Sequence, residues 1–347
     1  MWTYCYYINS IWNDLMAAHL PWALRTHGGP DHLGVPLYDF SSNSNACGPC
    51  PAAWTAVQQA DARQYPDANY TDLRAQLAAF HGVDPRRVLL AGSASEFIFR
   101  ITALAVQRGA SGVWLPPHSY GDYAQAALAW RLRVVARPAQ SQLRWACDPS
   151  SPLGMAHADL HHLPGPAAMC VLDRAYEPLR LSDSLALSEE ALQKFWQLWT
   201  PNKALGLTGV RAAYAIAPVN AEEVTLALEQ LCPSWPVGAH GVAMLQAWVS
   251  PGVQTWLADS LNTLRAWKAR QLALCESLGW TCLPSHANFF CARPALPVGA
   301  TLQQTLGALR IQGIKLRDTR SFGLPGHVRV SVQPPLAQDT LRVALQI

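Results

Sequence analysis

A single basic residue, Lys203, precedes a glycine-rich turn and an arginine in the run Trp-Thr-Pro-Asn-Lys-Ala-Leu-Gly-Leu-Thr-Gly-Val-Arg-Ala-Ala-Tyr. A lysine that is desolvated, or that lies near a second cation, can act as a Schiff-base nucleophile. Leu205 and Leu207 supply apolar surroundings, and Arg211 supplies a planar cation that suits a phosphate. Most lysines are solvated surface residues, so the spacing alone also leaves a surface role open.

Further motifs with reactive or flexible residues follow one another along the chain. In order they are His27-Gly28-Gly29, the Ser-x-Asn-x-Asn run from Ser41 to Asn45, Tyr65-Pro66-Asp67, Gly92-Ser93-Ala94-Ser95-Glu96, Tyr120-Gly121-Asp122-Tyr123, Asp173-Arg174-Ala175-Tyr176 and the run from Ser321 to Arg329. Together with the lysine run, this ordered set resembles fold-type I pyridoxal-phosphate enzymes. The similar branch holds histidinol-phosphate aminotransferase and the threonine-phosphate decarboxylase of cobalamin biosynthesis. The resemblance covers almost the whole chain and implies pyridoxal 5'-phosphate as cofactor.

The segments that position these motifs read as helices alternating with short buried strands. Helical periodicity covers residues 71–80, 95–106, 222–231 and 257–278, and short apolar runs cover 113–115, 134–136, 169–172, 212–217, 287–292 and 328–332. This alternation predicts an α/β fold. The resemblance implies the fold-type I form, in which a mostly parallel central sheet flanked by helices forms a large domain beside a smaller α+β C-terminal domain.

A break in this pattern between Pro233 and Gly252 predicts the change of domain. We therefore expect an N-terminal arm over residues 1–37, a large cofactor-binding domain over 38–240 and a small C-terminal domain over 241–347. The arm is expected to pack on the small domain or on a partner subunit.

Composition excludes several classes of partner. The chain has 347 residues, of which 50% are hydrophobic and 14% charged, with a net charge of +3 and no basic cluster. Neither nucleic acid nor an anionic membrane is therefore an expected partner, and no apolar run is long enough for a membrane span. Nine scattered cysteines, an odd number, suit a reducing compartment, and the N-terminus lacks the charged region of an export signal. We predict a cytoplasmic protein.

The resemblance assigns a role to each residue around the cofactor ring. Asp173 ends an apolar run, where a carboxylate requires a cationic partner or serves as a cap. The implied partner is the protonated pyridine nitrogen of the cofactor, and Tyr176 is implied to hydrogen-bond the ring oxygen. Lys203, Asp173 and Tyr176 form the implied catalytic set. Tyr120 resembles the residue that stacks on the ring, with Tyr123 as the alternative in another register.

The cofactor phosphate is expected at the start of a helix. Ala94 and Ser95 lie in a turn that leads into this helix, where backbone amides and a hydroxyl can meet a phosphate or simply cap the helix. Thr200 and Arg211 are implied to complete the phosphate site. Tyr65 resembles a residue that reaches the phosphate in the partner's site, which implies a homodimer with shared active sites.

Two arginines are left for the substrate. Arg329 resembles the residue that grips an amino-acid carboxylate, and Arg317 precedes the same glycine- and proline-rich loop. Asn43, in the Ser-x-Asn-x-Asn run, is the third expected substrate contact. Two guanidinium groups at one pocket predict a dianionic or phosphorylated amino acid as substrate.

The chain departs from the family pattern at a few positions. Ser151 stands where relatives carry an asparagine that bonds the ring oxygen, and Asn202 replaces a hydroxyl residue before the lysine. Cys47 and Cys50 form a Cys-x-x-Cys motif, for which a redox function is an alternative to a structural turn. A metal site is not expected, because no second cysteine or histidine pair lies at matching spacing.

The leading functional hypothesis is decarboxylation of L-threonine O-3-phosphate to an aminopropanol phosphate. It depends on His27-Gly28-Gly29, the Ser-x-Asn-x-Asn run and Arg317-Asp318, which look more like the decarboxylase than the aminotransferase. The alternative is an aminotransferase that acts on histidinol phosphate or a related amino acid. A third possibility is a non-catalytic or redox-responsive relative that keeps only the fold.

Overall fold

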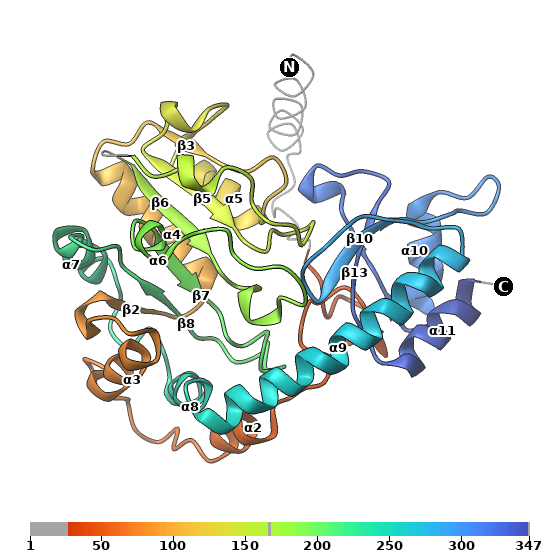
Figure 1. Cartoon of the computed structure of the whole chain (residues 1–347), viewed down its shortest axis with the longest axis horizontal. Coiled ribbons are helices and arrows are strands. Elements are labelled where there is room, and N and C mark those ends of the chain that lie inside the picture. The colour runs from red at the N-terminus through yellow and green to blue at the C-terminus, as the bar shows by residue number, and fades with distance from the viewer. Residues whose placement is uncertain (1–26, 166–167, 346–347) are drawn as a thin grey trace.

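The computed structural model describes residues 27–165 and 168–345, and its largest sheet has seven strands in the order β2-β8-β7-β6-β5-β3-β4 (Figure 1). The strands are β2 (Val88–Ala91), β3 (Gly112–Trp114), β4 (Arg133–Val135), β5 (Leu143–Cys147), β6 (Met169–Asp173), β7 (Trp196–Trp199) and β8 (Ala213–Ile216). Strand β8 runs antiparallel to β2 and β7, and the other pairs are parallel. The sheet confirms the predicted α/β class.

Helices cover both faces of this sheet, because successive residues of each strand point to opposite sides. In β2, Leu89 and Ala91 join one apolar cluster and Val88 and Leu90 join another. The helices of the first cluster are α4 (Ala94–Gln107), α5 (Gly121–Ala129) and α7 (Glu222–Gln230). Those of the second are α2 (Pro51–Gln58), α3 (Thr71–His81) and α8 (Ala239–Trp248). The large sheet is thus the middle layer of three.

A second, antiparallel sheet forms the C-terminal unit, with the strand order β12-β13-β10-β9. Its elements are β9 (Thr281–Cys282), β10 (Phe289–Arg293), α10 (Leu302–Ile311), β12 (Arg317–Asp318), β13 (Val328–Ser331) and α11 (Pro335–Leu345). The short strand β1 (Tyr38–Asp39) pairs in parallel with β11 (Ile314–Lys315) beside this sheet. Residues that follow the expected arm therefore pack with the C-terminal unit, and Phe40 belongs to its core.

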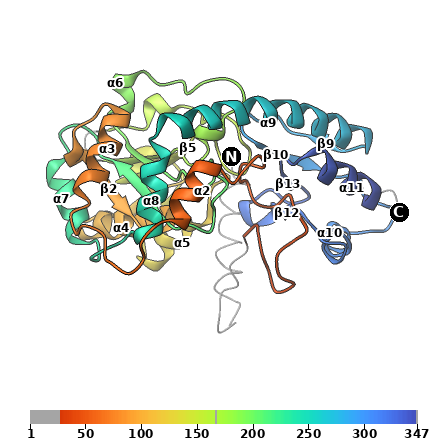
Figure 2. The same ribbon diagram turned by 90° about the horizontal axis from the view of Figure 1, so that it is seen from below.

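The helix α9 (Pro251–Ser277) connects the two units (Figure 2). It has 27 residues, which at 1.5 Å per residue gives a length of about 40 Å. Val253 and Leu257, near its start, belong to a core of the large sheet, whereas Cys275, near its end, belongs to the core of the small one. The domain change expected after residue 240 falls within α8, and its exact position stays a prediction.

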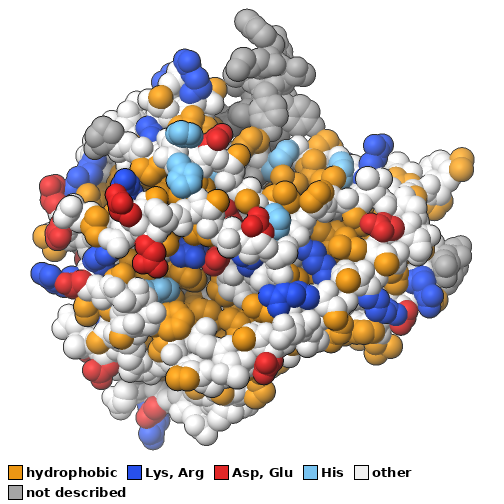
Figure 3. All heavy atoms as spheres, viewed as in Figure 1, with side chains coloured by type: hydrophobic (Ala, Val, Ile, Leu, Met, Phe, Trp, Pro, Cys, Tyr) orange, Lys and Arg blue, Asp and Glu red, His pale blue; other side chains and the backbone are white. Residues whose placement is uncertain are grey.

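Short helices complete the described chain. They are α6 (Glu189–Leu192) and the 3-10 turns Pro85–Arg87, Pro138–Gln140, Leu160–His162, Glu177–Leu179 and Arg320–Phe322. Among the described residues, no helix combines the length and hydropathy that crossing a membrane requires. Acidic and basic side chains are interspersed over the face in Figure 3, so the described part of this face has no large patch of one charge. Residues 1–26 of the expected arm lie outside the described residues.

Candidate active site

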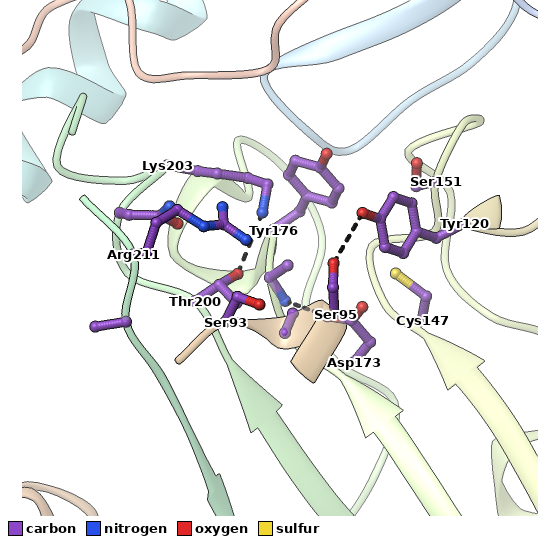
Figure 4. A pocket seen from close by; sticks show the side chains of 14 residues that line it. Ser93, Ser95, Tyr120, Cys147, Ser151, Asp173, Tyr176, Thr200, Lys203 and Arg211 are labelled. Carbon is purple, nitrogen blue, oxygen red and sulfur yellow. Dashed lines mark hydrogen bonds between the residues drawn. The ribbon is translucent and has the colours of Figure 1, made fainter. Parts of the chain in front are cut away.

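A cavity opens at the carboxyl ends of β5, β6 and β7, the edge where open α/β sheets usually build ligand sites. Its walls are formed by Ser93, Ala94, Ser95, Tyr120, Cys147, Ser151, Asp173, Ala175, Tyr176, Thr200, Asn202, Lys203, Arg211 and Ala212 (Figure 4). Apart from Tyr65, every residue predicted to contact the cofactor lines this cavity. Residues that are far apart in the sequence are therefore brought to one place.

The amine of Lys203 points into the cavity from a tightly held loop (Figure 4). Its Nζ donates to Thr200 Oγ1 over 3.3 Å and lies 5.5 Å from the centroid of the Tyr176 ring. The preceding Asn202 is buried, and its amide donates to the carbonyl oxygen of Val210 over 3.3 Å. Asn202, which departs from the family pattern, thus joins the two ends of the loop through a side-chain hydrogen bond.

The Cys-Gly-Pro-Cys motif packs beneath the lysine loop. A Cβ atom on Gly206, whose φ is +70°, would lie 2.9 Å from the Cα of Gly48, so this crossing has no room for a side chain. Cys47 and Cys50 are free thiols, and Cys47 Sγ donates to the carbonyl oxygen of Ser260. Burial raises the pKa of Cys47, whereas a redox-active cysteine usually has a lowered pKa. The contacts of the motif are those of a structural turn.

Asp173 places a buried carboxylate at the end of β6, with only 4% of the residue exposed. Its Oδ2 accepts a hydrogen bond of 2.6 Å from Tyr123 Oη, and its Oδ1 accepts one of 2.9 Å from the backbone amide of Ala175. Burial raises the pKa of Asp173, while the hydrogen bond from Tyr123 and the charge of Lys203 oppose that rise. Keeping this buried carboxylate charged therefore costs free energy unless a cationic ligand binds beside it.

Tyr120, and not its alternative Tyr123, faces the cavity. Tyr120 Oη lies 3.3 Å from Ser95 Oγ, and burial raises the pKa of this phenol, which keeps it neutral. Tyr123 is fully buried and stacks on Trp145 with a centroid distance of 4.4 Å. Tyr120, at the start of α5, thus forms the aromatic part of the cavity wall.

The start of α4 supplies donors suited to a phosphate. Ser93 Oγ accepts from the backbone amide of Glu96 over 3.1 Å, so the helix has an ordinary cap. Ser95 lies in the first turn of the helix, and its hydroxyl lies at the cavity wall, 3.3 Å from Tyr120 Oη. Arg211, an exposed residue, enters from the same side as Lys203 and directs its guanidinium toward Thr200 (Figure 4). Both expectations for this turn, a cap and an anion site, are compatible with the geometry.

Arg329 lies next to the cavity and contacts one of its wall residues, Ser151. Its Nη1 donates to Ser151 Oγ over 3.3 Å and its Nη2 to the carbonyl oxygen of Ser41 over 3.1 Å, and the residue is only 7% exposed. Ser151 therefore bonds the arginine that is expected to hold the substrate. At this position a short hydroxyl has taken the place of the family's longer amide.

Arg317 faces Arg329 directly across the β12–β13 pair. The guanidinium carbons of Arg317 and Arg329 lie 4.9 Å and 5.4 Å from the ring centroid of Phe322. Burial, followed by the charge of Arg329, lowers the pKa of Arg317 to about 10. The third expected substrate contact, Asn43, donates to Tyr176 Oη over 3.2 Å, and its buried Oδ1 has no hydrogen-bond partner.

Tyr65 lies outside the cavity of its own chain. It is 77% exposed and stacks on Trp235 with a centroid distance of 4.4 Å. Trp235 also donates to the carbonyl oxygen of Pro66 over 3.1 Å, which ties the tyrosine segment to the loop before α8. The expected role of Tyr65 in a partner's site stays a prediction.

Four features of the site were not anticipated from the sequence. Cys147, Ala175 and Ala212 line the cavity, and Tyr123 contacts Asp173 instead of the ring position. Ala175, Ala212 and Tyr123 each share a motif with an assigned residue, and Cys147 lies shortly before Ser151, so these positions were the available signal. In the described ranges, no three His, Cys, Asp or Glu side chains gather as a metal site would require.

Comparison with known proteins identifies the class to which this fold and site belong. The family model for aminotransferase class I and II matches residues 35–151 and 145–347. The chain is 29% identical to the histidinol-phosphate aminotransferase of Ruegeria pomeroyi over 335 residues, which covers 88% of this chain and 90% of that protein. The protein belongs to the class I and II aminotransferase family.

Solved structures agree with this fold. Histidinol-phosphate aminotransferase from Sinorhizobium meliloti, in complex with pyridoxal-5'-phosphate, gives a TM-score of 0.77 at 20% identity and covers 94% of each chain. L-threonine-O-3-phosphate decarboxylase from Porphyromonas gingivalis gives 0.75 at 20% identity, with 89% of this chain and 98% of that chain covered. These structures confirm the predicted fold-type I architecture, and the family match confirms the predicted cofactor, pyridoxal phosphate.

The donor set of the cavity fits this cofactor. Asp173 offers a buried carboxylate that lacks a cationic side chain bonded to it among the described residues, which suits a protonated ring nitrogen. Lys203 offers the amine, and Tyr120 contributes an aromatic ring to the cavity wall. Ser95, Thr200 and Arg211 line the same cavity and offer hydroxyl and guanidinium donors suited to a phosphate.

Proposed function

We propose that this enzyme decarboxylates L-threonine O-3-phosphate to (R)-1-aminopropan-2-yl phosphate in cobalamin biosynthesis. One observation carries the proposal: two of the segments that distinguish the decarboxylase pattern meet at Ser41, and the third lies one strand away from Arg329, which also contacts Ser41. The Gly29 amide donates to Ser41 Oγ over 2.9 Å, while Arg329 donates to the Ser41 carbonyl. Arg317 faces Arg329 across the adjoining strand pair. The glycine motif, the Ser-x-Asn-x-Asn run and both arginines therefore lie together beside the cavity, next to its wall residue Ser151.

This group of residues suits a substrate with two anionic groups. The guanidinium of Arg329 is a planar fork that can bind a carboxylate through two hydrogen bonds. Arg317, one strand away, adds positive charge for a phosphate ester. O-phosphothreonine carries both groups, whereas histidinol phosphate carries a phosphate but no carboxylate.

The residues of the cavity would decide which bond at the substrate's α-carbon breaks. Bound pyridoxal phosphate supplies an electron-withdrawing ring that weakens the α-carbon bond perpendicular to it. By gripping the carboxylate, Arg329 would hold the carboxylate bond in that orientation. Tyr120 would stack on the ring and hold it in place, and the Lys203 amine would return a proton to the α-carbon after carbon dioxide leaves.

Incubation with O-phosphothreonine and pyridoxal phosphate tests the proposal. We expect release of carbon dioxide and formation of an aminopropanol phosphate when no keto acid is present. A strict requirement for 2-oxoglutarate, with glutamate as a product, would contradict decarboxylation and favour transamination.

A second candidate is transamination of histidinol phosphate or a related amino acid. The observation in its favour is that curated relatives at 24–29% identity carry the name histidinol-phosphate aminotransferase. In this case the Lys203 amine would take the proton from the α-carbon of the substrate and pass it to another carbon. Arg317 and Arg329 would hold the two carboxylates of 2-oxoglutarate, which reacts in the second half of the cycle. Formation of glutamate from histidinol phosphate and 2-oxoglutarate would support this candidate.

We further infer that the enzyme works as a homodimer with shared sites. Tyr65 supports this inference because 77% of it is exposed while its ring is held by Trp235. An aromatic side chain fixed in an outward direction is suited to a partner surface. Light scattering on the purified protein tests the inference: a monomer at micromolar concentration would exclude it.

A further inference from the structure

The buried carboxylate of Asp173 is held by donors from two elements. The phenol of Tyr123, in the first turn of α5, donates to Oδ2 over 2.6 Å. The backbone amide of Ala175 donates to Oδ1 over 2.9 Å. Both carboxylate oxygens are therefore engaged, which fixes the plane of the carboxyl group at the end of β6.

The phenol of Tyr123 can act only as a donor in this pair. Burial raises its pKa far above the usual value, and the nearby charge of Asp173 raises it further. Tyr123 is fully buried, and its ring stacks on Trp145 at 4.4 Å with an interplanar angle of 13°. The stacked ring has little freedom to rotate, so the hydroxyl is aimed at the carboxylate before any ligand arrives.

The same helical turn connects this pair to the wall of the cavity. Tyr120 and Tyr123 are three residues apart at the start of α5, and their rings meet edge to face at 5.8 Å. One turn of helix thus supplies both the ring wall and the hydroxyl that contacts Asp173. A displacement of α5 would disturb the two features together.

We propose that Tyr123 is a positioning residue that holds the Asp173 carboxylate in its charged form and at a fixed orientation toward the cofactor ring. The proposal rests on the proposed function only in placing that ring beside Asp173. A short hydrogen bond to a carboxylate stabilises the charged form relative to the neutral acid. Tyr123 therefore makes an ionised carboxylate available at neutral pH in a site where burial opposes it.

Other titrating groups around Asp173 come from two further elements. Lys203, on the loop after β7, favours the charged carboxylate through its own positive charge. Cys147, at the end of β5, is buried, and its pKa is raised well above the usual value, so it stays neutral. Among the described side chains, Tyr123 is the titrating group that bonds the carboxylate directly.

The substitution Tyr123→Phe tests the proposal because it removes one oxygen and keeps the stacked ring. The dissociation constant for pyridoxal phosphate is measured by absorbance between pH 5 and pH 9, with the full-length chain. At neutral pH we expect it to rise about tenfold to a hundredfold, since hydrogen bonds to charged groups are among the stronger ones. The pH below which binding weakens should move up by about one to two units.

The matched control is Tyr214→Phe. Tyr214 is also fully buried, and its hydroxyl accepts from Trp248 over 3.1 Å and meets His81 Nε2 at 2.9 Å, away from the cavity. This variant should lose thermal stability but keep the cofactor affinity and its pH profile. Tyr123→Phe in an Asp173→Asn background should cause no further loss of affinity, because the neutral amide does not titrate.

The possible outcomes separate this proposal from the proposed function. An equal loss of affinity at every pH, with no shift of the acid limb, would show that Tyr123 only packs and would overturn the proposal. If Tyr123→Phe does not fold, infrared spectroscopy of the cofactor-saturated wild type is decisive. We expect an ionised Asp173 carboxylate at pH 7, and a protonated one would contradict us. Failure to decarboxylate O-phosphothreonine leaves these cofactor measurements unaffected.

Discussion

The substitution Arg329→Lys examines how the substrate carboxylate is held. Arg329 is 7% exposed, and its two terminal nitrogens donate to Ser151 Oγ and to the Ser41 carbonyl. Lysine keeps the charge but loses the fork, so one of two hydrogen bonds to the carboxylate disappears. A hydrogen bond to a charged group contributes about 1.5–3 kcal/mol. At about 1.4 kcal/mol per tenfold change, kcat/KM should fall about tenfold to 150-fold.

The assay is the rate of carbon dioxide release from O-phosphothreonine, with kcat and KM determined separately. Cofactor affinity should stay within about twofold of the wild type, because Arg329 is not part of the cavity wall. Arg320→Lys, at an exposed position of the neighbouring turn, is the control and should change neither value. A fall in kcat/KM of less than about threefold would refute the assignment of Arg329 to the carboxylate.

Three further predictions concern the partner subunit, Ser151 and stability. Tyr65→Phe should weaken cofactor binding about tenfold in absorbance titrations, because a phenol hydrogen bond to the partner's phosphate is lost. Ser151→Ala should raise KM about two- to tenfold with little change in kcat, since Arg329 loses an acceptor; an unchanged KM would exclude this link. Burial lowers the pKa of His81 to about 4, so the neutral form stabilises the fold above pH 6.5 and this contribution disappears as the pH falls toward 4. Denaturant unfolding should show a loss of about 3 kcal/mol over that range, which His81→Gln should abolish.

The long periodic segments of the chain could be predicted from the sequence. The helices expected at residues 71–80 and 95–106 are found as α3 and α4, and the apolar run at 169–172 is found as β6. Strands β5 and β7 were missed because polar residues interrupt them. Arg144 in β5 bonds a loop carbonyl, and Gln197 in β7 accepts from Arg174 over 3.1 Å. Such residues fit inside a sheet only through tertiary partners that local periodicity does not reveal.

The cavity residues were predictable because they sit in ordered motifs, but their mutual contacts were not. Tyr123 and Asp173 are 50 residues apart in sequence, and the packing of α5 on the sheet, where Tyr123 stacks on Trp145 of β5, brings them to 2.6 Å. The exact start of α9 could not be predicted from the periodicity either. Pro251 opens the helix, six residues before the predicted start at Leu257, because proline is well suited to the first helical position.

The most direct test of the account is chemical trapping at Lys203. Cofactor-saturated protein is reduced with borohydride, digested and mapped by mass spectrometry. We predict a reduced pyridoxal-phosphate adduct on Lys203, and we expect that Lys203→Ala yields no adduct while it still binds the cofactor. An adduct on another lysine, or none in saturated wild-type protein, would contradict the central claim that this amine carries the chemistry.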